Sequence, residues 1–372
     1  MVKGDKLKDY LKTTDRLDIP RIDYTNGEPS ILLEPQSTNL VTYSEDFSQW
    51  IAGGDTSIQS GFLAPNGTNT AYKVSGTSGA LTLSGIANQT RTRTIWAKTV
   101  SGNGQANLCS YKDNTNNLFT ITNQWQRFEV NGTTTATGST SFYAVDFRGG
   151  TTLTEILIWG AQLEDLLYAT SYIPTSGSAV TRSADAANNA GNSDLFNDSE
   201  GVLYAEIKAL ANDGTSRHFS INDGTAANKV EIYYDSTTNE INGHINVSGA
   251  SSALFSQTFA TVLEYHKVAV KYKANDFSMF VDGRQIATDT SGVVFPANTL
   301  NNLAFDKGNA TLDFYADVKS VMVFKEALTD LELEKLTGYN NHELYMNYYN
   351  RLSYLGLVEE YNVESDINNY IL

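Results

Sequence analysis

The sequence predicts an all-β protein made of two tandem antiparallel β-sandwiches of the jelly-roll type, with short helices near its ends. Segments of alternating apolar and polar residues recur from Trp50 to Phe324. Stretches rich in Gly, Asn and Thr separate these segments, with no helical periodicity between them. A polar stretch at residues 176–198 divides the segments into two runs, and 372 residues are enough for two or three domains. One sandwich is therefore expected on each side of this linker.

Residues 1–44 are expected to form an N-terminal anchor and lead-in segment. Leu7, Tyr10 and Leu11 recur at helical spacing, which predicts a short amphipathic helix over residues 5–15. A helix of this length is too small to stand alone, so it either docks onto a neighbour or another subunit, or it frays.

Residues 45–175 are expected to form the first sandwich. Strands at this spacing without helices between them indicate an antiparallel sandwich or jelly roll. Cys109 is the single cysteine, which excludes an internal disulfide, and we expect it in the core. The predicted strands are Ala71 to Val74, Leu81 to Ser84, Thr94 to Lys98, Leu118 to Thr122, Trp125 to Val130, Phe142 to Phe147 and Leu153 to Ala161.

The stretch from Gly160 to Asp185 is expected to join the two sandwiches. Pro174 fixes its own φ and favours an extended residue before it, which predicts a semi-rigid exit from the first sandwich. The Ser-, Gly-, Thr-, Ala- and Asn-rich residues that follow predict a flexible seam within the linker, residues 176–198.

Residues 199–340 are expected to form the second sandwich, with a hairpin that turns at Asp235–Asn239. Thr329 and Glu332 form a capping-box pattern, which predicts a short helix after the last strand. The predicted strands are Gly201 to Leu210, Val230 to Tyr234, Ile241 to Val247, Lys267 to Tyr272, Phe277 to Val281, Gln285 to Thr288 and Val318 to Phe324.

Residues 341–372 are expected to form a C-terminal helix and tail. Tyr345, Tyr348, Leu352 and Leu355 recur at three- and four-residue spacing, which predicts a helix with one apolar stripe. Such a stripe must be buried, either on the second sandwich or against copies of itself, and we favour the contact between copies.

Two distant stretches resemble a known family. GAQLE, ATSYIPT and TRSAD lie between Gly160 and Asp185, and RIDYTNGEPSILLEPQSTNLVTYSEDFSQW precedes them at residues 21–50. In this order they resemble bacteriophage virion proteins, in which the signature closes a carbohydrate-binding-module-like β-sandwich. NQWQRFEV, at residues 123–130, resembles a strand that carries a Trp in such modules. VDGRQIA (281–287) and VKSVMVFKEALTDLELEKL (318–336) resemble the laminin-G and concanavalin A-like lectin family.

The resemblance implies a phage virion surface or fibre protein, such as a tail fibre or head fibre. It would project its sandwiches to adhere to host-surface glycans without catalysis, and it would be located in the virion after assembly in the host cytoplasm. Its implied partners are other virion proteins and further copies of itself, with a trimer favoured. Two alternatives remain open: a purely structural capsid or tail decoration protein that binds only virion proteins, and a polysaccharide depolymerase.

Composition excludes several classes of function. A formal net charge of −16 and a pI near 4.6 argue against binding nucleic acid, which needs clustered Lys and Arg. No apolar run is long enough to span a bilayer, and the opening residues lack the apolar core of a signal peptide, so we expect no membrane insertion.

The sequence offers no catalytic motif. HExxH, GxSxG, P-loop and GxGxxG patterns are absent, and the four histidines show no ligand-like pairing. His244 and His266 are expected at the surface. Jelly-roll glycoside hydrolases need a carboxylate pair, often placed on one strand face in an ExDxE pattern. No ExDxE pattern occurs in this sequence. The nearest candidates, Glu231 and Asp235, have the wrong spacing and flank a turn. We therefore expect no enzyme activity.

Binding sites are expected on loops and sheet faces. Exposed aromatic rings stack on sugars, and Asn, Asp and Arg bind their hydroxyl groups. Loop aspartates can bind calcium, although turns also favour Asp for backbone reasons. The glycan-binding candidates are Trp50, Tyr111, Trp125, Arg217, Tyr233 and Tyr234; the calcium-ligand candidates are Asp213, Asp223, Asp235 and Asp282.

Overall fold

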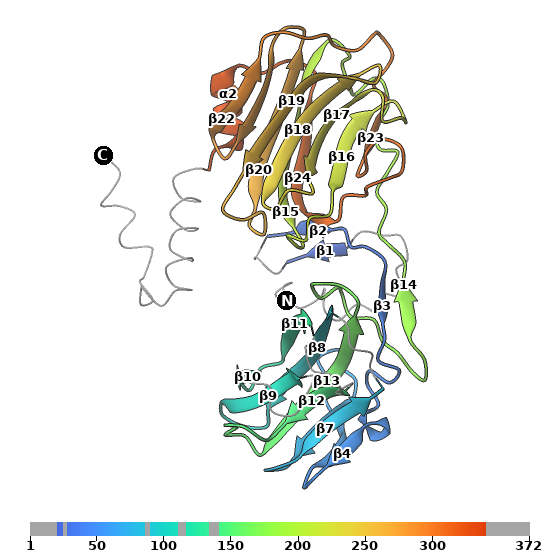
Figure 1. The fold of residues 1–372 in the computed structure, drawn as a ribbon, viewed down its shortest axis with the longest axis vertical. Helices are drawn as coiled ribbons and strands as arrows, with labels where there is room; N and C mark the ends of the chain where they lie inside the picture. Colours follow the sequence, from blue (N-terminus) through green and yellow to red (C-terminus); the bar gives the residue numbers. More distant parts are fainter. Residues whose placement is uncertain (1–20, 25–27, 86–89, 111–116, 134–140, 340–372) are drawn as a thin grey trace, which may run out of the picture.

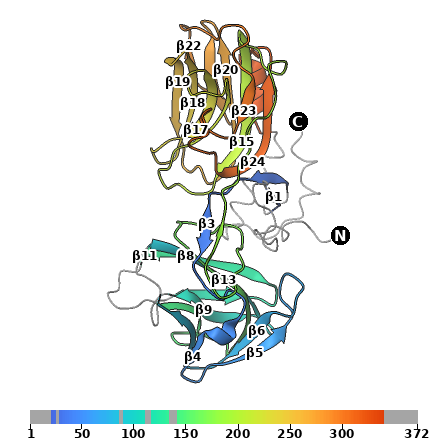
Figure 2. The same cartoon turned by 90° about the vertical axis from the view of Figure 1, so that its right-hand side faces the viewer.

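The computed structural model describes residues 21–24, 28–85, 90–110, 117–133 and 141–339, and it confirms the all-β prediction. Two β-sandwiches lie end to end along the long axis of the molecule, and β3 (Ser37–Asn39) and β14 (Val180–Arg182) run between them (Figures 1 and 2). The helices expected in residues 5–15 and 341–372, and the candidate Tyr111, lie outside the described residues. No helix of the described part is long and apolar enough to cross a membrane.

The first sandwich begins after a short 3-10 helix, Phe47–Gln49. Its strands are β4 (Ile51–Gly53), β5 (Ser57–Phe62), β6 (Ala71–Ser75), β7 (Ala80–Ser84), β8 (Thr90–Thr99), β9 (Gly104–Ser110), β10 (Leu118–Ile121), β11 (Gln126–Thr133), β12 (Ser141–Asp146) and β13 (Glu155–Glu164). They form two five-stranded antiparallel sheets, β10-β9-β12-β7-β4 and β11-β8-β13-β6-β5. Every strand predicted here is present, and Cys109 is buried as expected. Ile95, Phe142 and Ile158 belong to the core between the sheets.

The second sandwich also consists of two antiparallel sheets. Its strands are β15 (Glu200–Ala209), β16 (Arg217–Asn222), β17 (Lys229–Tyr234), β18 (Glu240–Val247), β19 (Ala250–Thr258), β20 (His266–Lys273), β21 (Phe277–Val281), β22 (Arg284–Asp289), β23 (Asn302–Ala304) and β24 (Ala316–Phe324), joined by β1 (Arg21–Asp23) and β2 (Ser30–Leu32). The sheet orders are β1-β2-β24-β15-β20-β21-β22 and β19-β18-β17-β16-β23. The predicted hairpin is confirmed, because β17 pairs with β18 with Tyr234 opposite Ile241.

The predicted capping box and helix are also confirmed. Helix α2 (Asp330–Thr337) begins after Thr329, whose side chain accepts a hydrogen bond from the Glu332 backbone, while the Glu332 carboxylate accepts the Thr329 N–H at 2.8 Å. Leu333 of α2 packs with Tyr204 and Phe280 on the outer face of the seven-stranded sheet. The helix therefore covers this face of the second sandwich.

The lead-in segment belongs in part to the second sandwich, although it precedes the first in the sequence. The hairpin of β1 and β2 extends the seven-stranded sheet, because Ile31 of β2 pairs with Val318 of β24. The chain then runs through β3 into the first sandwich, where Val41 and Phe47 join the core.

The seam after Pro174 was expected to be flexible, and this prediction is wrong for Val180–Arg182. These residues form β14, which pairs with β3 over Ser37–Asn39. The lead-in supplies a strand edge that the local sequence does not reveal, and backbone hydrogen bonds to that edge order the seam.

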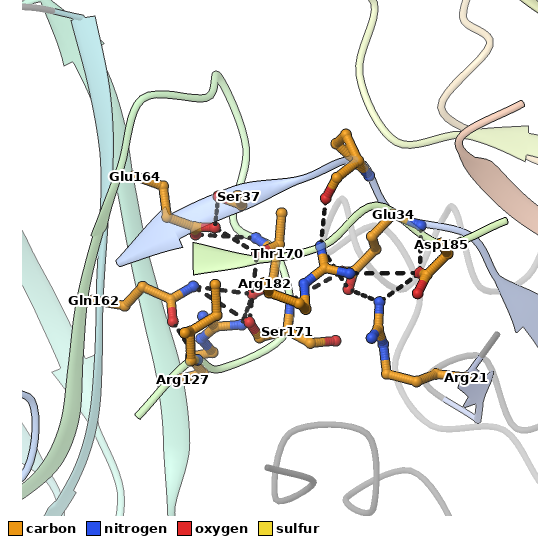
Figure 3. A network of polar contacts seen from close by, with 12 residues as sticks. Arg21, Glu34, Ser37, Arg127, Gln162, Glu164, Thr170, Ser171, Arg182 and Asp185 are labelled. Atoms are coloured by element: carbon orange, nitrogen blue, oxygen red, sulfur yellow. Dashed lines mark hydrogen bonds and ion pairs between the residues drawn. The ribbon is translucent and has the colours of Figure 1, made fainter. Parts of the chain in front are cut away.

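Four buried charged side chains meet at this junction (Figure 3). Arg21 binds the Glu34 carboxylate and, at 2.6 Å, the Asp185 carboxylate. Arg182 donates to the Pro35 carbonyl oxygen at 2.6 Å and lies 3.5 Å from Glu34. The four charged side chains are only 1% to 2% exposed. A buried ion cluster of this kind requires every partner, because removing one leaves an uncompensated charge.

The same network continues into the end of β13 (Figure 3). Glu164 accepts the Ser37 hydroxyl at 2.6 Å and the Thr170 N–H at 3.1 Å. Glu34 accepts the Ser171 N–H at 2.9 Å. The segments GAQLE, ATSYIPT, TRSAD and the lead-in thus bind one another directly, which gives the distant halves of the signature a common structural role.

Candidate functional site

The outer face of the five-stranded sheet of the second sandwich is not covered by α2 (Figure 1). Polar side chains of this sheet line a hollow there, among them His218, Glu231 and His244. Along β17, Val230 and Ile232 are buried in the core. Because side chains alternate along a strand, Lys229, Glu231 and Tyr233 lie on the opposite face. This outer face is where neighbouring strands can combine side chains into a site.

Glu231 is the centre of that site. His244 of β18 lies directly opposite it in the strand register, and its Nδ1 is 3.1 Å from Glu231 Oε1. His218 of β16 places its Nδ1 2.9 Å from Glu231 Oε2, and Lys229 Nζ lies 2.7 Å from Oε1. The Glu231 side chain is 2% exposed, so both of its oxygens are occupied by neighbours and not by water.

These contacts keep Glu231 ionised. Burial raises its pKa, but the hydrogen bonds from His218 and His244, with the charge of Lys229, outweigh burial and hold the pKa far below its usual range. The Glu231 carboxylate is therefore a fixed acceptor that orients two imidazoles and one ammonium group. It is not a proton donor near neutral pH.

A hollow of about 420 Å³ opens above this cluster. The rings of Tyr233 and His218 stack beside it, with centroids 4.4 Å apart and planes 6° apart. Tyr233 is half-buried, so its ring is braced by the sheet while part of it remains accessible. A braced aromatic ring beside polar groups suits a ligand that combines an apolar face with hydroxyl groups.

The loop after β23 forms another wall of the hollow. Lys307 and Leu312 line it from this loop, and Leu312 is 42% exposed. Leu312 has a φ of 56°, a left-handed conformation that a branched side chain rarely adopts. Its carbonyl oxygen accepts the His218 N–H at 2.9 Å, which joins the loop to β16. The loop is therefore held against the site.

A family comparison covers this part of the chain. Residues 181–334 match the profile of the Concanavalin A-like lectin/glucanases superfamily. The second sandwich is a concanavalin A-like domain. Comparison with curated protein sequences finds no match.

Solved structures resemble parts of the chain at low similarity. The carbohydrate-binding module CBM40 of the Ruminococcus gnavus IT-sialidase is 17% identical, with a TM-score of 0.34, covering 41% of this chain and 95% of that one. A heptameric SAP-like pentraxin from Limulus polyphemus is 13% identical, with a TM-score of 0.33, covering 41% and 74%. Sheep galectin-11 is 10% identical, with a TM-score of 0.25, covering 33% and 89%.

Of the aromatic candidates, Tyr233 lines the hollow of the concanavalin A-like domain, whereas Trp50 and Tyr234 are buried in cores. The expectation that they present exposed rings is wrong. Trp50 is 5% exposed and donates its indole N–H to the Tyr43 carbonyl oxygen at 3.0 Å. Tyr234 is 3% exposed and stacks on Phe314, because it points inward from β17.

Two other glycan candidates lie away from the hollow. Arg217 is 4% exposed and pairs with Asp213 at 2.7 Å, so it is not free to bind a ligand. Trp125 is half-buried on the first sandwich, packs against the Trp96–Trp159 cluster, and has Lys98 Nζ 5.4 Å from its ring centroid. Trp125 remains a candidate for a separate contact.

The four calcium candidates make contacts within the protein. Asp213 binds Arg217, and Asp223 accepts the Thr225 N–H in a turn. Asp235 accepts the Ser236 N–H at 2.6 Å. Asp282 pairs with His266, which is 9% exposed, so the surface position expected for His266 is wrong. Within the described ranges, no group of three or more His, Cys, Asp or Glu side chains could hold a metal ion.

The sequence analysis did not predict the cluster around Glu231. Glu231 lies 13 residues after His218 and 13 residues before His244. These spacings are too long for a local sequence motif, and the two histidines do not have the spacing of paired ligands. The available signal was strand register: placing β16, β17 and β18 side by side would have brought the three side chains to one face.

Proposed function

We propose that the concanavalin A-like domain binds a glycan in the hollow over Tyr233 and His218, without catalysis. The stacked pair of rings carries this proposal, because a braced ring offers its face to the C–H side of a sugar. The His244 and Lys229 side chains beside it can meet hydroxyl groups. The match of this domain to a superfamily of lectins and glucanases supports the same reading.

The carboxylates of the hollow favour binding over hydrolysis. Glycoside hydrolysis needs one protonated acid and a second carboxylate about 5 to 10 Å away. Glu231 is held ionised by its neighbours. Asp235 also lines the hollow, but it lies just beyond the end of β17, where it accepts the Ser236 N–H at 2.6 Å. Glu231 therefore does not have the environment of a catalytic acid.

A glycan array with the purified protein tests the proposal. We expect binding by the native protein and up to about a tenfold loss in Tyr233→Ala, since stacking contributes about 0.5 to 1.5 kcal/mol. Leu263→Ala is the control, because Leu263 is 47% exposed and lies outside the hollow. Equal binding by Tyr233→Ala and the control would exclude this site. Repeating the array with EDTA tests whether binding requires calcium.

We also propose that the protein is a phage virion surface or fibre protein that forms trimers. The support for this role is the sequence signature that resembles virion proteins, whose separate segments contact one another at the junction. Light scattering should give three times the 40.7 kDa chain mass, and mass spectrometry of purified particles should detect the chain. A monomeric mass would contradict the trimer, and absence from particles would contradict the virion role. Presence in particles without glycan binding would favour the structural decoration alternative.

A further inference from the structure

The hollow contains two lysines but has carboxylate contacts for only one of them. Lys229 lies at the start of β17 and binds Glu231 at 2.7 Å. Lys307 reaches the same hollow from the loop after β23. Within the described part of the chain, the Lys307 ammonium forms no ion pair or side-chain hydrogen bond. Glu231 is already shared among Lys229, His218 and His244.

Lys229 and Lys307 line the same hollow, so their positive charges oppose one another. Burial lowers the pKa of Lys229, the nearby Lys307 charge lowers it further, and Glu231 opposes both effects. The hollow therefore carries two lysines beside two carboxylates, Glu231 and Asp235, and only Lys229 has a carboxylate partner among the described residues. An anionic group between the two lysines would relieve the repulsion and supply the missing acceptor.

The position of Lys307 is fixed by the backbone. Its N–H donates to the Thr311 carbonyl oxygen at 2.9 Å, which closes a tight loop. Ala310 and Leu312 in this loop both have a φ of 56°. Non-glycine residues adopt this conformation at a cost, and such strain gathers at functional sites. The loop therefore holds the Lys307 side chain at the wall of the hollow.

We propose that the glycan bound in this hollow is acidic, with its carboxylate or sulfate group placed between Lys229 and Lys307. This inference rests on the proposed glycan binding at Tyr233 and names the class of sugar. The ring of the sugar would lie on Tyr233 while its anionic group meets the two ammonium groups. Because the rest of the protein is acidic, short acidic oligosaccharides should bind better than long polyanions, which the whole surface repels.

The test is an array of matched glycan pairs, in which each uronic-acid, sialylated or sulfated oligosaccharide is printed beside its neutral parent. The native protein should bind acidic members at least about tenfold more tightly than their parents, as expected for one charge-assisted hydrogen bond. Carboxylated and sulfated members distinguish the two sources of the anion. Lys307→Gln should reduce this preference about tenfold, and Lys307→Arg should retain most of it.

Lys335→Gln is the matched control, because it removes the same charge from an exposed position on α2 of the same domain. It should leave the acidic preference unchanged. Equal binding of acidic and neutral members by the native protein, or an unchanged preference in Lys307→Gln, would overturn the acidic-glycan inference while the proposed glycan binding stands. Binding of no glycan at all would overturn both.

Discussion

The guanidinium Nη2 of Arg21 lies 2.6 Å from the carboxylate Oδ2 of Asp185, although 164 residues separate them in the sequence. Arg21 precedes the first sandwich and Asp185 follows it, so this ion pair closes the chain around that sandwich (Figure 3). Both side chains are 1% exposed, and Arg182 lies 3.5 Å from the same carboxylate. The junction is therefore a buried cluster of ion pairs that lies between the apolar cores of the two sandwiches.

Asp185→Ala should destabilise the protein strongly. Among the described residues, it leaves Arg21 and Arg182 buried with Glu34 as their only carboxylate partner, and breaking a buried charge cluster costs about 3 to 5 kcal/mol. Urea denaturation, followed by fluorescence, measures the loss. Glu155→Ala is the control, because Glu155 is 46% exposed in its pair with Lys73, and exposed pairs contribute at most about 1 kcal/mol. Equal losses in both variants would refute the structural role of the junction.

The junction network should also show energetic coupling. Arg21 and Asp185 share partners, so the double variant Arg21→Ala/Asp185→Ala should lose less stability than the two single losses added together, by about 1 to 3 kcal/mol. Additive losses in the double-mutant cycle would show that the two residues act independently.

Glu231 should make the concanavalin A-like domain sensitive to acid. Its pKa is lower in the folded protein than in the unfolded chain, so the unfolded chain takes up the proton first as pH falls. The stabilisation is present above about pH 4.5 and is lost as pH falls towards the folded pKa. Hydrogen exchange of β16–β18 at pH 7 and pH 4 should show the loss in the native protein and a smaller pH effect in Glu231→Gln. An identical pH dependence would contradict this assignment.

His266 should stabilise the fold in its charged form. Burial lowers its pKa, but the bonds to Asp282 at 2.6 Å and to the Thr261 carbonyl oxygen at 2.8 Å outweigh burial and raise it. Two acceptors face the two ring nitrogens, so only the imidazolium satisfies both. The stabilisation is complete below pH 6.5 and is lost as pH rises through the folded pKa.

NMR titration of the His266 ring tests this directly. The native midpoint should lie above 6.5, and Asp282→Asn should lower it because the neutral amide no longer favours the charged ring. A native midpoint below the usual value, or one unaffected by Asp282→Asn, would contradict the arrangement.

Alternation of apolar and polar residues was sufficient to predict most of the sandwich strands, but β4, β5, β9, β16, β19 and β23 were missed. Strand β16 is the one among them that matters for the site. Its sequence, Arg-His-Phe-Ser-Ile-Asn, offers only Phe219 and Ile221 as apolar residues, because its other positions include the polar outer face. The same strand supplies His218 to the site. A strand that local sequence did not reveal thus supplies part of the wall of the hollow.

The local sequence also did not predict which aromatic residues beside turns are buried. Trp50 follows a turn and was expected to be exposed, yet it packs against Phe47 and Phe142 because the chain folds back over the sheet there. Tyr233 and Tyr234 are adjacent in the sequence, yet Tyr234 is buried in the core and Tyr233 is half-buried on the outer face. Only the orientation of β17 relative to the core distinguishes the two residues. The alternation of apolar and polar residues in a sequence predicts that a segment is a strand. Which of its two faces points into the core depends on how the strand pairs with other strands.

Gly243 of β18 should be intolerant of a side chain, and its replacement should disturb the site on the other side of the strand. A Cβ at Gly243 would lie 2.6 Å from Val270 Cγ2 and 3.3 Å from the Met279 sulfur, both on the opposing sheet. Gly243→Ala should therefore cost about 1 to 3 kcal/mol through overpacking. It should also weaken glycan binding, since moving β18 displaces His244 from Glu231.

A matched control and a rescue make this prediction specific. Gly53→Ala adds the same methyl group to β4, where the nearest atom would be the Ala80 carbonyl oxygen at 3.7 Å, so the stability of this variant should change by less than about 0.5 kcal/mol. Val270→Ala should cost less in the Gly243→Ala background than in the native protein, because it makes room for the added methyl group. Urea denaturation of the single and double variants measures both effects. If the two losses simply add, the close approach of β18 to β20 is not what requires glycine at position 243.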